Sequence, residues 1–157
     1  MRRTVVFLTL LVLATPIAAS AAMRAPGDGS LSVRDLDGVF YVSARGAIIG
    51  RCTECTLFVD ERADIDTINP VVFGARGTDR DGDGDKDLYR GKDLRFKVIG
   101  GSFRVRITRS TDVDLSLVGK GTFRIQGTAG RYLINDSDPQ LVTTDGVQLR
   151  LHASTQP

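Results

Sequence analysis

The sequence contains no tryptophan, a single histidine and only two cysteines. Sugar-binding sites usually need broad aromatic platforms, so the missing tryptophan disfavours a lectin or a sugar-stacking enzyme. A zinc site needs four ligands, and Cys52, Cys55 and His152 are too few within one chain. No G-x-S-x-G, H-E-x-x-H or glycine-rich phosphate loop occurs either. These absences favour a role that does not involve catalysis.

Residues that favour helix interiors are also scarce. The chain has 17 Asp and 17 Gly but only two Glu and four Lys. Aspartate and glycine favour turns and caps, whereas glutamate and lysine favour the middle of helices. Beyond the first 22 residues, no segment repeats apolar residues at the spacing of a helix face. The composition therefore argues against a helical protein.

The N-terminus has the three parts of a secretory signal. Met1-Arg2-Arg3 is positive, residues 4–19 are almost wholly apolar, and Ala19-Ser20-Ala21 fits the small-residue cleavage rule. We therefore expect a signal peptide at 1–22 and a single β domain at 23–157, with an uncleaved N-terminal anchor as the alternative. The expected location is secreted or extracytoplasmic, in the cell envelope, and no later segment is apolar enough to span a membrane.

Net charge limits the class of partner. The formal net charge is +2, and the predicted leader contributes both excess positive charges. A balanced mature chain excludes a broadly cationic nucleic-acid binder and a polybasic membrane-surface protein. The expected partner is an unidentified extracellular or cell-envelope ligand.

Apolar and polar residues alternate with a period of two along most of the chain. This alternation is typical of strands with one buried and one wet face. It occurs in the segments 94–98, 103–108, 113–117, 122–126 and 147–152, and shorter candidates lie at 31–34, 39–44, 47–49, 56–60, 71–74 and 132–134. Gly100-Gly101 and Gly119-Lys120-Gly121 join neighbouring runs, which predicts an antiparallel meander over 93–126. The predicted fold is all-β, a single antiparallel β-sandwich or β-barrel domain, with a β-solenoid as the alternative.

An acidic loop, expected at 75–93, is the most distinctive segment. Its aspartates occupy every second position: Asp79, Asp81, Asp83, Asp85 and Asp87. Calcium prefers six to eight oxygen ligands, and alternating carboxylates can surround one ion. With Gly84, the pattern D-x-D-x-D-G resembles EF-hand-like, dockerin and thrombospondin type 3 calcium loops. Arg90 stands where an EF-hand places its last glutamate, and a solvated loop neutralised by nearby arginines and lysines remains the alternative to a Ca²⁺ site.

The two cysteines form the pair Cys52-Thr53-Glu54-Cys55. In an exported protein the first expectation is a disulfide, and free thiols come second. A thiol-redox role would need this pair at the N-terminus of a helix that follows a strand, which the pattern does not provide.

One segment of the last third of the chain carries a family resemblance. Residues 119–132, GKGTFRIQGTAGRY, resemble a segment in small secreted all-β proteins of actinobacteria that have no assigned function. The resemblance implies an exported β domain and contributes no catalytic residue.

The function expected from these patterns is an exported, non-enzymatic envelope or extracellular β domain with a structural or binding role, stabilised by calcium. One alternative is an extracellular hydrolase that uses paired aspartates, with candidates Asp64/Asp66, Asp112/Asp114 and Asp136/Asp138. Another is a thiol-redox accessory protein that uses Cys52 and Cys55.

Overall fold

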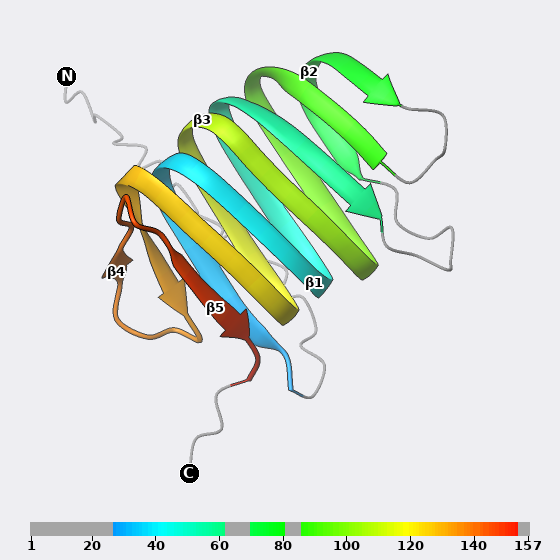
Figure 1. The fold of residues 1–157 in the computed structure, drawn as a ribbon. Helices are drawn as coiled ribbons and strands as arrows, with labels where there is room; N and C mark the ends of the chain where they lie inside the picture. The colour runs from blue at the N-terminus through cyan, green and yellow to red at the C-terminus, as the bar shows by residue number, and fades with distance from the viewer. Residues whose placement is uncertain (1–26, 62–69, 81–85, 154–157) are drawn as a thin grey trace, which may run out of the picture.

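The computed structural model describes residues 27–61, 70–80 and 86–153 (Figure 1). Every regular element in this part of the chain is a strand, which confirms the all-β prediction. The strands are β1 (Gly29–Glu61), β2 (Val71–Arg80), β3 (Lys86–Ile134), β4 (Gln140–Leu141) and β5 (Val147–Leu151). The predicted signal peptide at 1–22 lies outside the described residues.

The two long strands β1 and β3 wind together as a flattened antiparallel coil (Figure 1). Phe40 pairs with both Ile107 and Ile125, and Ile107 pairs in turn with Leu57. One turn of the coil therefore runs from Phe40 to Leu57 in β1 and from Ile107 to Ile125 in β3. Because turns of β1 alternate with turns of β3, each strand segment has antiparallel neighbours.

Each turn passes from one layer of the coil to the other, so a single sheet supplies two packed layers. The first layer contains 31–34, 47–51, 94–98, 113–118 and 131–134, and the second contains 39–45, 56–60, 87–91, 103–108 and 121–126. β2 pairs with β3 at one end of the coil, and β4 and β5 pair with β3 at the other end. The sheet is not closed, and its two layers pack in the manner of a β-sandwich.

The hydrophobic core lies between the two layers. The predicted alternation is confirmed, because the apolar members of the main runs are buried: Leu94, Phe96, Val98, Phe103, Val105, Ile107, Val113, Leu115, Leu117, Phe123 and Ile125. The ring of Phe123 stacks on Phe40 at a centroid distance of 6.5 Å and meets Tyr132 edge-on at 6.3 Å. Burial of each large side chain contributes about 1.5–3 kcal/mol, so these contacts hold the layers together.

The predicted meander over 93–126 is wrong. Segment 94–98 pairs with β1 and β2, whereas segment 103–107 pairs with two other stretches of β1. Gly100 and Gly101 therefore form a corner that passes the chain to the other layer, not a hairpin. A hairpin and a corner both need positive φ, and the glycine pair alone does not distinguish them.

The coil turns between its layers along two edges. We call the first the aspartate edge; its corners in β1 and β3 lie at 35–37, 53–54, 92–93, 109–112 and 127–130. The second is the glycine edge, whose corners contain Gly46, Gly100, Gly101 and Gly119, all with positive φ. Neighbouring corners along each edge belong alternately to β1 and β3.

Candidate functional site

Three aspartates on the aspartate edge have left-handed backbone conformations. Their φ angles are 53° at Asp35, 54° at Asp112 and 53° at Asp93. Aspartate tolerates this region better than most residues because its short polar side chain can hydrogen-bond nearby. Each residue turns its strand from one layer to the other, so the geometry of the corners also sets where these carboxylates lie.

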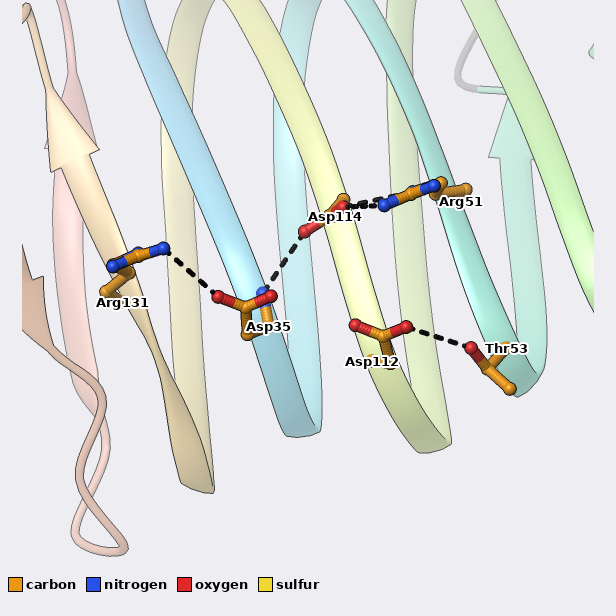
Figure 2. A network of polar contacts seen from close by, with 6 residues as sticks. All are labelled: Asp35, Arg51, Thr53, Asp112, Asp114 and Arg131. Carbon is orange, nitrogen blue, oxygen red and sulfur yellow. Dashed lines mark hydrogen bonds and ion pairs between the residues drawn. The ribbon is translucent and has the colours of Figure 1, made fainter.

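Asp114 is the centre of the polar network at this edge (Figure 2). It lies in β3 between two turns of β1. Its Oδ2 accepts hydrogen bonds from Arg51 Nε at 3.0 Å and Arg51 Nη2 at 2.6 Å, and its Oδ1 accepts one from the Asp35 backbone N–H at 3.1 Å. Asp114 therefore connects the first turn of β1 to the second.

The surroundings of Asp114 keep its carboxyl ionised. The Asp114 side chain is 12 % exposed and that of Arg51 is 66 % exposed. Burial raises the pKa of Asp114, but the hydrogen bonds from Arg51 and from the Asp35 N–H outweigh it, so the pKa is lower than usual. The same hydrogen bond raises the pKa of Arg51. At neutral pH this pair is a carboxylate and a guanidinium.

Asp112 and Ser110 form further links beside Asp114. The backbone N–H of Asp112 donates to Asp37 Oδ1 at 2.8 Å, and Thr53 Oγ1 donates to Asp112 Oδ2 at 3.0 Å (Figure 2). Ser110 Oγ donates to the carbonyl oxygen of Gly38 at 2.6 Å. Alternate residues of one stretch of β3 are thus bonded to the first turn of β1.

The same carboxylates form a group that could hold a metal ion. One carboxylate oxygen from each of Asp35, Asp112 and Asp114 lies within 4.8 Å of the others. Two guanidinium groups already face this group: Arg51 on Asp114, and Arg131, whose Nη2 is 3.3 Å from Asp35 Oδ2 (Figure 2). Asp35 and Asp112 are exposed, so water screens much of the repulsion among the three charges.

The acidic loop predicted from the sequence lies elsewhere in the fold. β2 extends to Arg80 and β3 begins at Lys86, and Arg80 pairs with Asp87, so paired strands occupy part of the range 75–93. Asp87 also pairs with Val59, towards the glycine edge and away from Asp35, Asp112 and Asp114.

The five predicted calcium ligands are only partly described. Asp79 lies in β2 opposite Leu88, and Asp87 Oδ2 accepts a hydrogen bond from Tyr89 Oη at 2.6 Å. Asp81, Asp83 and Asp85 lie outside the described residues, so calcium binding by this loop stays a prediction.

The predicted disulfide is confirmed. Cys52 and Cys55 are joined, and the residues are only 2 % and 4 % exposed. Cys52 follows the first-layer segment 47–51, and Cys55 precedes the second-layer segment 56–60. The bridge therefore closes a corner of the aspartate edge. It is compatible with an oxidising compartment.

Sequence reasoning singled out Asp112 and Asp114 as a pair but missed Asp35, Asp37 and Arg51. A signal for the first corner was present, because the apolar positions change from odd numbers, ending at Val33, to even numbers at Leu36. A change of this kind in the alternation indicates that the strand bends there, because the buried face passes to residues of the other parity. It does not reveal which strand will lie opposite, and Arg51 becomes the partner of Asp114 only through that pairing.

No helix in the described ranges is long and apolar enough to cross a membrane. No protein-family model matches the chain, and no curated protein or solved structure matches it either.

Proposed function

We propose that this protein is an exported, non-enzymatic β domain of the cell envelope or extracellular space, with a structural or binding role and with calcium as a stabilising ion. The observation that supports this proposal most is the state of the converging carboxylates on the aspartate edge. Asp114 is ionised, with a lowered pKa, and bonded to two turns of β1. The Asp114 carboxylate therefore serves as a structural link between turns of the coil.

The alternative of a hydrolase with paired aspartates draws support from the closeness of Asp112 and Asp114. A general acid in such an enzyme needs a raised pKa so that it is protonated at working pH. Asp114 shifts in the opposite direction, and Asp112 Oδ2 already accepts a hydrogen bond from Thr53. These contacts favour a structural role for the pair.

The alternative of a thiol-redox protein is disfavoured by the position of the cysteines. Reactive cysteines need access to their partners and a setting that lowers the thiol pKa, such as a helix N-terminus. Cys52 and Cys55 are buried at a corner between two strand segments. A bridge in this position stiffens the corner.

Calcium binding is the second part of the proposal, and the acidic loop is the preferred site. The D-x-D-x-D-G pattern supplies carboxylates in the spacing that calcium loops use. Antiparallel pairing of Arg80 with Asp87 fixes the two strand ends next to the loop, which lowers the entropy cost of closing it around an ion. The carboxylate group of Asp35, Asp112 and Asp114 is the competing site.

The melting temperature in millimolar calcium and in EGTA tests this part. We expect calcium to raise it by roughly 5 °C, as for a ligand well above its Kd. The triple variant D81N/D83N/D85N should lose the rise, whereas the matched variant D35N/D112N should keep it. Equal melting temperatures of the wild type in both buffers would contradict the calcium proposal, and loss of the rise only in D35N/D112N would move the site to the aspartate edge.

The export part is tested separately by the mass of the protein recovered from its native host. We expect an extracytoplasmic product that lacks residues 1–22. A full-length product retained in the cytosol would overturn the proposed location.

A further inference from the structure

The outer surface of the second layer contains two adjoining hollows rich in arginine. One hollow of about 550 Å³ lies between Arg90, Arg104, Arg106 and Arg109, and an adjoining hollow includes Arg124. Tyr41 and Arg106 line both hollows, so the two adjoin at these residues. We call this surface the arginine groove, defined by these five arginines and Tyr41.

Little negative charge balances these arginines. Among the described residues lining the two hollows, Asp60 is the one acid, and its Oδ2 lies 3.5 Å from Arg104 Nη1. Within the described ranges, Arg90, Arg106 and Arg109 form no ion pair with a carboxylate. In a chain of nearly balanced charge, such a concentration of one sign creates a local field that attracts anions.

The strand register places aromatic rings between the positive charges. Arg124 and Arg106 both pair with Tyr41, one from each side, and Arg106 also pairs with Phe58. Adjacent strands are about 4.8 Å apart, so Arg124 and Arg106 are separated by roughly 10 Å with the Tyr41 ring between them. Tyr41 is 36 % exposed, and its ring is open to a ligand.

Arg104 uses little of its donor capacity on the described residues. Its Nε is buried and has no hydrogen-bond partner among the described residues. Its one ion pair, to Asp60, is long at 3.5 Å. A guanidinium is satisfied best by two parallel hydrogen bonds to a carboxylate, sulfate or phosphate. Among the described residues Arg104 has no partner of that kind, and because its side chain is 34 % exposed, its terminal Nη atoms, in contrast to the buried Nε, are open to a ligand.

We propose that the arginine groove binds a linear anionic polysaccharide, a sugar chain carrying carboxylate, sulfate or phosphate groups. Arg104 and Arg106 would bind the acidic groups, and hydroxyl groups such as those of Thr56 and Thr108 would bind sugar hydroxyls. Ion pairing would supply most of the binding, in place of the broad aromatic platform that this chain lacks, and the Tyr41 ring would add a single contact with a sugar face. This inference rests on the proposed extracytoplasmic binding role and names its ligand class.

Other polyanions fit this surface less well. Single-stranded nucleic acids bind to successive exposed aromatic platforms, whereas Phe58 is only partly exposed and is separated from Tyr41 by Arg106. Anionic membranes attract surfaces where lysines and arginines surround inserted apolar side chains. Here the arginines are interspersed with Thr56, Thr108 and Thr122, which favours a hydroxyl-rich ligand.

Binding to dextran sulfate, with neutral dextran of equal length as the control, tests the proposal. The variant R104Q/R106Q should weaken binding by at least roughly tenfold, because hydrogen bonds to charged groups contribute that much. The matched variant R34Q/R95Q removes the same charge from exposed residues outside the groove and should change the affinity less than twofold. Unchanged melting temperatures would confirm that both variants are folded.

Further arms define the ligand and the limits of the inference. Polygalacturonate and dextran phosphate distinguish carboxylate-bearing and phosphate-bearing sugar chains from sulfate-bearing ones. Three results would overturn the inference. The first is an equal loss of affinity in both double variants, and the second is no binding to any of the three polyanions. The third is tighter binding to oligo-dT or to phosphatidylglycerol vesicles than to the polysaccharides. Failure here would leave the calcium and export measurements unaffected, so the proposed function is judged independently.

Discussion

The aspartate edge and the glycine edge make the same turn between layers with different chemistry. At the aspartate edge, Asp35 and Asp112 adopt positive φ and use their polar groups to bond neighbouring turns. At the glycine edge, Gly46 and Gly119 adopt positive φ without any side chain. The comparison shows that two factors determine which residue can stand at a corner of the coil: whether the residue tolerates positive φ, and whether there is space for its side chain.

Space explains why the two edges differ. Gly46 and Gly119 pair directly, and a Cβ on Gly46 would lie 2.1 Å from the Val118 carbonyl oxygen. A Cβ on Gly119 would lie 2.2 Å from the Arg45 carbonyl oxygen. Because the two backbones approach this closely where Gly46 meets Gly119, no side chain fits at these two corners. The exposed corners at Asp35 and Asp112 leave room for carboxylates.

The largest effect is expected from Gly119→Ala. The clash with the Arg45 backbone and the positive φ together should lower the free energy of unfolding by about 3 kcal/mol. Gly100→Ala is the matched control, because its Cβ would meet nothing within 4 Å and should cost only about 1 kcal/mol. Urea denaturation measures both, and equal losses would show that tight packing does not distinguish this corner.

The next largest effect is expected at the centre of the aspartate edge. Asp114→Asn removes the charge that accepts two hydrogen bonds from Arg51 and should cost about 2 kcal/mol. Asp112 is an exposed neighbour whose side chain accepts a hydrogen bond from the Thr53 hydroxyl, so Asp112→Asn should lower the free energy of unfolding by less than about 0.5 kcal/mol. If urea denaturation gave the two variants the same stability, Asp114 would not be the main link.

The smallest effect is expected from Asp35→Gly, which rebuilds one corner in the style of the opposite edge. The variant loses the exposed contact with Arg131 but relieves the positive φ, and the backbone N–H that donates to Asp114 remains. These contributions nearly cancel, so the stability should change by less than about 0.5 kcal/mol. A loss comparable to that of Asp114→Asn would mean that the Asp35 carboxylate itself holds the corner.

The strands and the core were predictable because alternation reports burial directly. Phe103, Val105 and Ile107 point inwards wherever their strand is placed, so local pattern and final structure agree. The coil path was not predictable from the same pattern. Gly100-Gly101 suits a hairpin as well as a corner, and the partner of 94–98 is found in β1, far away in the sequence.

The candidate site was predictable only in part for the same reason. Asp112 and Asp114 share one strand, so their spacing in the sequence already places them close together. Asp35 and Arg51 join them through pairing between different turns of the coil. The arginines of the groove likewise come from separate segments, so their positions in the sequence do not show that they line one surface.

The pKa of Asp114, followed by NMR titration of its side-chain carboxyl, tests most directly that the converging carboxylates are structural links. We predict a midpoint below the ordinary value of 3.8, so that Asp114 stabilises the fold above that pH and this stability is lost as the pH falls through the midpoint. The Asp114→Asn variant should not show this part of the loss of stability at low pH. A midpoint above 3.8 would contradict the account, because Asp114 would then have the property expected of a general acid.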